Sequence, residues 1–150
     1  MSSFWRTWLK VWCVGVGLFG LVLAGAAFEA TSGPTRLVYG LIGGPAMLDM
    51  DATLRFSIAL MGAVTLGWSV TMFAAIEAAC LLGDRGRPVW RLITVSLGVW
   101  YVVDSSLSVA TGFGLNAVSN TLIVAAYLVP VLMSGVMRGP AQDRTAPQRA

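Results

Sequence analysis

Four long apolar runs, almost free of charged side chains, constrain this chain more than any other feature. An α-helix needs about 20 such residues to cross a hydrocarbon core of about 30 Å. Only 11% of the 150 residues are charged, against about 25% in a soluble domain, so a water-facing surface cannot be covered. Period-two alternation, the mark of a transmembrane barrel, is missing. The sequence therefore predicts an all-α integral membrane four-helix bundle, a single domain over residues 1–137, with spans at Val11–Phe28, Phe56–Leu82, Leu92–Val109 and Ala117–Met137.

The basic residues predict how the bundle is oriented. Eight of the ten lie before the first run, between the second and third runs, or after the fourth; the other two lie on the opposite side. Basic residues accumulate in cytoplasmic segments, so we expect a bacterial inner-membrane protein with both termini in the cytoplasm. The net charge of +3 is then a topology signal and not a nucleic-acid-binding patch. The eight are Arg6, Lys10, Arg85, Arg87, Arg91, Arg138, Arg144 and Arg149, and the two are Arg36 and Arg55.

The ends of the chain carry three further patterns. The first run has the basic start and the Ala24-Gly25-Ala26 sequence of a signal peptide, but its length favours a retained span. Residues 138–150 are polar and rich in Pro, Gln and Ala, which predicts a disordered cytoplasmic tail. Aromatic residues at helical spacing near the N-terminus predict an anchor at the cytoplasmic headgroups; these are Phe4, Trp5, Trp8 and Trp12.

Small residues at helical spacing predict where helices pack. In lipid, association depends on close backbone approach, which small residues permit. The first run carries such a stripe, and the second has small residues near its outer half. The stripe favours ordinary packing between these two helices, with self-association as the alternative. Pro130 should remove a hydrogen bond from the fourth helix and kink it. The predicted packing residues are Cys13, Gly17, Gly20, Ala24 and Ala27 with Gly62 and Gly67.

The chain contains no histidine and two cysteines, Cys13 and Cys80. Histidine-ligated metal sites, histidine-based catalytic triads and histidine-bound haem are therefore excluded. Two cysteines do not form a metal cage by themselves. Since the sequence shows no nucleophile–base pair and no set of metal ligands, we expect no catalytic residues, no cofactor and no metal, and hence no enzyme.

Two acidic residues fall inside the apolar runs, where ionisable groups are costly and face the bundle interior or water. Glu77 lies about 9 Å and Asp104 about 18 Å from the cytoplasmic connection at 1.5 Å per residue, so they should not share a proton. Polar residues surround Asp104, and Arg55 lies at its level, from where we expect it to snorkel inward and pair with Asp104. This outer-leaflet cluster is either a binding pocket for a lipid headgroup or small polar ligand, or a hydrogen-bond network that fixes helix register. Its members are Arg55, Tyr101, Asp104, Ser105, Ser108, Asn116 and Asn120.

The connection Ala30–Asp51 contains Ser32-Gly33-Pro34 and Gly43-Gly44-Pro45 on either side of an apolar stretch. This punctuation predicts a structured turn or a short interfacial helix that caps the outer face. Asp51 is the expected N-cap of the second long helix.

Two stretches together carry a resemblance to known proteins. Met61–Trp68 reads MGAVTLGW, and Leu97–Asn120 reads LGVWYVVDSSLSVATGFGLNAVSN. In these stretches the chain resembles a group of short bacterial four-span proteins without an assigned activity. In length and in its Gly-rich first two spans it is similar to DoxX-like membrane proteins. The resemblance implies a four-helix architecture and carries over no catalytic or binding residue.

These observations favour a non-enzymatic inner-membrane protein, either an accessory or assembly subunit or a module that binds lipid or a small ligand. The expected partners are membrane lipids and a second copy or a larger membrane complex, and not nucleic acid. The alternative is a small proton-coupled transporter or exporter that uses Glu77 or Asp104. The strong bias of basic residues argues against the dual insertion common among small multidrug exporters.

Overall fold

The computed structural model describes residues 1–43 and 49–138, and within these ranges it contains five α-helices and no strand. Four helices are long and apolar enough to cross a membrane. The all-α prediction and the four long apolar helices are thus confirmed. The predicted tail, apart from Arg138, lies outside the described residues. The helices are α1 (Ser3–Ala24), α2 (Gly33–Leu41), α3 (Ala52–Leu81), α4 (Arg87–Ala110) and α5 (Gly114–Met133), with short 3₁₀ turns η1 (Gly25–Ala27), η2 (Glu29–Thr31) and η3 (Gly83–Gly86).

The helix ends follow from local chemistry. Ser2 caps α1, so this helix begins well before the apolar run. Asp51 is the N-cap of α3, and its Oδ1 accepts a hydrogen bond of 2.7 Å from the amide of Leu54. The fourth long helix ends at Met133, earlier than the predicted Met137. Gly135 explains the difference because its φ of +67° is left-handed, a conformation that ends a helix and favours glycine.

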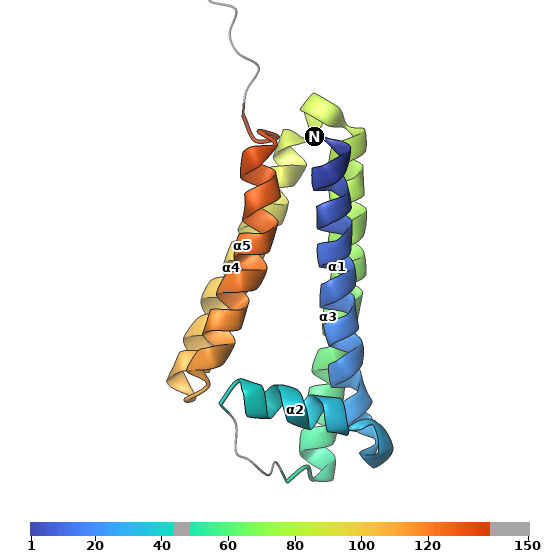
Figure 1. The fold of residues 1–150 in the computed structure, drawn as a ribbon, viewed down its shortest axis with the longest axis vertical. Helices are drawn as coiled ribbons and strands as arrows, with labels where there is room; N and C mark the ends of the chain where they lie inside the picture. The colour runs from blue at the N-terminus through green and yellow to red at the C-terminus, as the bar shows by residue number, and fades with distance from the viewer. Residues whose placement is uncertain (44–48, 139–150) are drawn as a thin grey trace, which may run out of the picture.

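The four long helices form two pairs (Figure 1). α1 lies along α3, and α4 lies along α5. The N-terminus, η3 and the end of α5 share one end of the molecule, whereas α2 lies across the other end. The two pairs approach each other near the N-terminus and diverge toward α2 (Figure 1).

The pair α1 and α3 is held close by two facing glycines. A Cβ atom at Gly20 would lie 2.7 Å from the amide nitrogen of Leu66, and one at Gly62 would lie 2.6 Å from the carbonyl oxygen of Gly20. Neither position has room for a side chain. Gly17 also faces α3, where an added Cβ would lie 2.8 Å from the hydroxyl of Ser69. The small-residue stripe of α1 therefore packs inside the molecule.

Two residues of the predicted packing set do not belong to this contact. Gly67 is exposed, and nothing lies within 4 Å of a Cβ added there. The prediction for Gly67 is therefore wrong. The residues of α3 that face α1 are Gly62, Leu66 and Ser69, and Gly67 lies on a different face of the helix. Ala27 lies beyond the end of α1, in η1, and is exposed. Cys13 is buried in the main core, and the amide of Ala24 lies against Gly62.

Aromatic rings join the two helix pairs, one ring from each long helix. The ring of Trp68 in α3 lies 5.6 Å from that of Trp100 in α4 and 6.2 Å from that of Trp12 in α1. Trp12 in turn lies 5.7 Å from Tyr127 in α5. Aromatic pairs at 4.5–7 Å add about 0.5–1.5 kcal/mol beyond burial. Trp12 and Tyr127 belong to the main core, and Trp68 and Trp100 pack against it. The other buried members of this core are Leu9, Cys13, Met72, Ile76, Ala79, Trp90, Ile93, Leu97 and Val131.

Pro130 leaves a carbonyl of α5 without its helical donor, and α1 supplies a replacement. Proline has no amide hydrogen, so the carbonyl of Ala126, four residues earlier, receives no intrahelical bond from it. The indole nitrogen of Trp8 donates to this oxygen at 2.8 Å, and the indole of Trp12 donates to the carbonyl of Ile123 at 3.0 Å. The side chains of Trp8 and Trp12 thus fasten α1 to α5, and Trp12 is buried; the headgroup anchor stays a prediction.

This pairing makes the cost of removing the Trp8 indole depend on Pro130. In the natural chain, Trp8→Phe should lower the free energy of unfolding by about 1 kcal/mol, the usual net contribution of one hydrogen bond. With Pro130→Ala present, residue 130 has an amide that can serve Ala126, so Trp8→Phe should cost less. A double-mutant cycle of SDS-induced unfolding in mixed micelles measures this coupling. Trp5→Phe is the control, since Trp5 donates no side-chain hydrogen bond within the described ranges. Equal costs in both backgrounds would contradict the compensation.

Helix α2 covers the end of the α1–α3 pair opposite the N-terminus. The buried hydroxyl of Thr35 donates to the carbonyl of Val22 at 2.7 Å. A small second core lies beneath α2, and Tyr39 packs against it. This core consists of Leu23, Ala26, Met50 and Ile58. The ring of Tyr39 also meets that of Phe113, in the α4–α5 turn, edge-on at 6.4 Å, and burial raises the pKa of this phenol. A short helix in this connection agrees with the sequence prediction. Residues 44–48 of the connection lie outside the described ranges.

Candidate functional site

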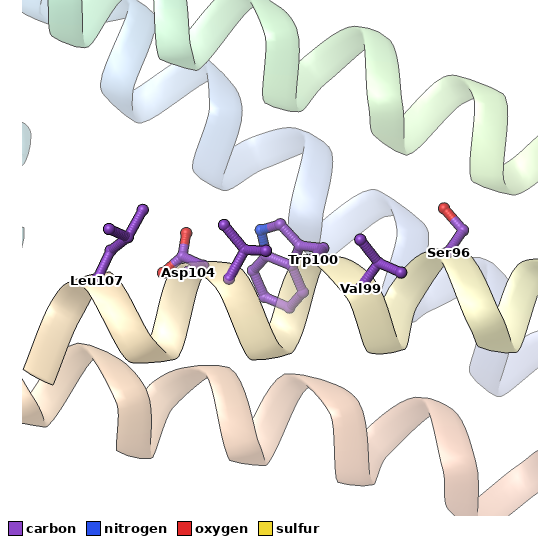
Figure 2. Close-up of a pocket in the computed structure, with 6 residues that line it drawn as sticks. Ser96, Val99, Trp100, Asp104 and Leu107 are labelled. Atoms are coloured by element: carbon purple, nitrogen blue, oxygen red, sulfur yellow. The ribbon is translucent and has the colours of Figure 1, made fainter.

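An open cavity of about 390 Å³ lies along an exposed face of α4, and the residues that line it all belong to this helix. Its volume falls within the range of about 300–1,000 Å³ that is typical of small-molecule sites. Figure 2 shows its labelled side chains projecting from the side of α4 that faces α1 and α3, away from α5. The wall is apolar except for one hydroxyl and one carboxylate. The lining residues are Ser96, Val99, Trp100, Val103, Asp104 and Leu107.

Asp104 is held by three hydrogen bonds, all to one of its two carboxylate oxygens. Its Oδ1 accepts from the side-chain amides of Asn116 at 2.9 Å and Asn120 at 2.8 Å, and from the hydroxyl of Ser108 at 3.2 Å. The two asparagines are four residues apart, so they share one face of α5. The amide of Asn120 also donates to Ser105 at 3.3 Å. The structure thus brings together Asp104, Ser105, Ser108, Asn116 and Asn120 between α4 and α5.

The second carboxylate oxygen of Asp104 has a different environment. Within residues 1–43 and 49–138, no group donates a hydrogen bond to Oδ2, and Asp104 forms no salt bridge. The side chain is half-buried and lines the cavity. Asp104 therefore combines a fixed oxygen on the α5 side with an oxygen that is available to a molecule in the cavity.

The predicted pairing of Arg55 with Asp104 is wrong. The Arg55 guanidinium instead forms a salt bridge with Glu29, and its Nε donates to the carbonyl of Met50 at 2.9 Å. Glu29 also pairs with Arg36 at 3.2 Å. Arg55 starts α3 at the same end of the molecule as Asp104, but its pair of helices diverges there from α4 and α5 (Figure 1). A nearer carboxylate therefore takes the guanidinium.

Tyr101 also lies apart from the Asp104 network. Its hydroxyl is 3.0 Å from that of Thr121 in α5, and this pair adds a second polar contact between the two helices. Thr121 was not among the predicted residues. Thr121 directly follows Asn120, and neighbouring residues of a helix point in different directions. Its contact with Tyr101 therefore depends on the register of α4 against α5.

Glu77, the second acid within an apolar run, is paired with two cations of α1. Its carboxylate accepts from Arg6 Nη2 at 2.5 Å and Nε at 3.2 Å, and Lys10 Nζ lies 3.4 Å away. Lys10 also lies over the ring of Phe73 at 5.8 Å. The sequence analysis missed these partners. The signal was present in the stripe of α1, whose alternating spacing of three and four extends backward from Cys13 through Lys10 to Arg6.

The two cysteines are unpaired, Cys13 buried and Cys80 half-buried. In the described part of the chain, no group of three or more His, Cys, Asp or Glu side chains is placed to hold a metal ion. No model of a protein family, no curated protein and no solved structure matches this chain. The resemblance to DoxX-like proteins therefore stays a prediction, and the function has to be inferred from the cavity and its lining residues.

Proposed function

We propose that this protein is a multi-pass inner-membrane protein that binds an amphipathic molecule, a lipid or a small ligand, in the cavity beside α4. The observation that carries the proposal is Asp104, a carboxylate fixed by α5 that also lines an otherwise apolar cavity. A buried network that served only to hold α4 and α5 together would not need to line a cavity of ligand size. Apolar walls with one polar anchor are the usual design of ligand sites.

The proposed topology places the N-terminus, η3 and the end of α5 in the cytoplasm. These parts lie at one end of the molecule (Figure 1), and eight of the ten basic residues belong to the segments at this end or follow them. Asp104 then lies in the outer half of the bilayer, and the cavity faces the divergence between the helix pairs. An acyl chain can reach it from the surrounding lipid. In this account the protein is a binding or accessory module and not an enzyme.

A bulky side chain in the cavity tests the proposal. Val103 lines the cavity and is 54% exposed, whereas its neighbour Val102 does not line it and is 60% exposed. Val103→Trp should therefore weaken lipid binding by about tenfold, equivalent to about 1.4 kcal/mol, and so reduce the fraction of protein that retains lipid. Val102→Trp should leave retention unchanged. Native mass spectrometry of protein released from nanodiscs measures the fraction. Equal retention by both variants would reject this cavity as the binding site.

The alternative of proton-coupled transport also remains a proposal. The ion pairs of Glu77 with Arg6 and Lys10 occupy both of its carboxylate oxygens. Asp104 is therefore the acid that such a mechanism would use, since it faces the cavity.

A further inference from the structure

Besides Asp104, the described residues contain an ion-paired cluster around Glu77, another around Glu29, and the pair of Arg87 with Asp84. In the two ion-paired clusters, opposite charges already meet within the chain. Asp49, Asp51 and Asp104 form no salt bridge with any described residue, but Asp49 and Asp51 are exposed, whereas Asp104 is half-buried. Residues 44–48, which lie outside the described ranges, carry no charged side chain. The cavity is therefore where an external charge would be complementary.

We infer that the cavity selects amphipathic molecules with a cationic amine, bound with the ammonium group against Asp104 Oδ2. The inference rests on the proposed function and adds the chemical class of the ligand. A carboxylate in an apolar wall is costly unless a charge or hydrogen-bond donors compensate it. The protein supplies three donors, all to Oδ1. An ammonium group carries both a positive charge and hydrogen-bond donors. It can therefore donate a hydrogen bond to Oδ2 and neutralise the charge of the carboxylate.

The aromatic residue of the cavity supports the same class of ligand. Trp100 lies four residues before Asp104, on the same face of α4, and lines the cavity with it. The face of an indole attracts cations, most strongly where water is excluded. The ring of Trp100 lies 5.6 Å from that of Trp68 in α3. An anionic headgroup would instead meet the Asp104 carboxylate as a like charge.

The length of the apolar wall defines the rest of the ligand. Ser96 and Asp104 are eight residues apart, about 12 Å along the helix axis. Val99 and Val103 lie between them on the cavity wall. An alkyl chain that starts at an ammonium group beside Asp104 would therefore pass along these valines toward the bilayer centre. A free hydrophobic amine and the amine headgroup of a phospholipid share this chemistry.

Three probes with one alkyl chain and different headgroups test the inference. Dodecylamine, dodecanol and dodecanoate are titrated separately against the full chain in nanodiscs of phosphatidylglycerol, and retention is measured by native mass spectrometry. Dodecylamine should bind at least about tenfold more tightly than dodecanol, because hydrogen bonds to charged groups contribute about 1.5–3 kcal/mol. Dodecanoate should bind more weakly than both. This comparison needs no variant and does not depend on the folding of a mutant.

A variant then assigns the selectivity to the carboxylate. Asp104→Asn keeps an oxygen acceptor for the amides of Asn116 and Asn120, and removes the charge. It should abolish the preference for the amine and leave dodecanol binding unchanged. A second arm replaces the added amine with nanodiscs containing equal phosphatidylethanolamine and phosphatidylglycerol. Selective retention of phosphatidylethanolamine identifies a lipid as the source of the amine, and its absence together with dodecylamine binding identifies a free amine.

The failures of the two proposals are distinguishable. Equal binding of dodecylamine and dodecanol, or an amine preference that survives in Asp104→Asn, overturns the inference of a cationic ligand. The cavity would still be a binding site if Val103→Trp then reduced retention of all three probes while Val102→Trp did not. Retention that is insensitive to Val103→Trp overturns both proposals together.

Discussion

Gly62→Ala is expected to destabilise the protein by about 2–3 kcal/mol, within the range of overpacking at a close contact. The added methyl group would lie 2.6 Å from the carbonyl oxygen of Gly20 and 2.8 Å from the carbonyl carbon of Leu23. These neighbours are backbone atoms, so relief requires α1 to move away from α3. The free energy of unfolding, measured by SDS titration in mixed micelles with tryptophan fluorescence, should report the loss.

The same helix provides the matched control. Gly67→Ala makes the same chemical change in α3, but nothing lies within 4 Å of the new methyl group. Because alanine is favoured over glycine in a helix by up to about 1 kcal/mol, this variant should be as stable as the natural chain or more stable. Equal destabilisation by Gly62→Ala and Gly67→Ala would contradict the close contact of α1 with α3.

Asp104→Leu is expected to loosen the contact between α4 and α5 more than any other change in the polar cluster. The amides of Asn116 and Asn120 would lose their shared acceptor, whereas the hydroxyl of Ser108 would keep its hydrogen bond of 2.7 Å to the backbone carbonyl of residue 104. Two of these bonds join α4 to α5, and hydrogen bonds between membrane helices average about 0.6 kcal/mol, so their loss predicts a cost of about 1 kcal/mol. Asp104→Asn, which keeps an acceptor, should cost less than half of this. Hydrogen exchange of the amides in the first turns of α5 should increase in Asp104→Leu.

Ser106→Leu is the control for this prediction. Ser106 is exposed on the same helix and forms no side-chain hydrogen bond with the described residues. Its substitution should leave exchange in α5 unchanged. If Asp104→Leu and Ser106→Leu gave the same exchange profile, the polar cluster would not hold α4 against α5.

Periodicity and composition predicted the parts of this molecule that depend on one helix at a time. The apolar runs indicated the four long helices, and Asp51 indicated the start of α3. The Asp104 cluster was predictable because Asp104 and Ser108, like Asn116 and Asn120, are four residues apart. Each pair thus lies on one helix face. Polar faces within apolar helices have few places to go except toward each other.

The features that the sequence analysis missed depend on the register between helices. Gly62 and Gly67 look equally suited to packing, and only the rotation of α3 decides which of them meets α1. The partner of Arg55 depends on the divergence of the two helix pairs, which brings Glu29 closer than Asp104. Val99 and Val103 of the cavity wall are exposed like the other valines of α4, so no local pattern singles them out.

A crystal structure of the protein in a lipidic mesophase tests the binding proposal most directly. The account predicts elongated electron density in the cavity beside Val99 and Val103, with its polar end within hydrogen-bond distance of Asp104 Oδ2. The density should be missing in Val103→Trp and present in Val102→Trp. A structure in which side chains of α1 or α3 fill this space in the natural chain, with Asp104 enclosed between α4 and α5, would contradict the account.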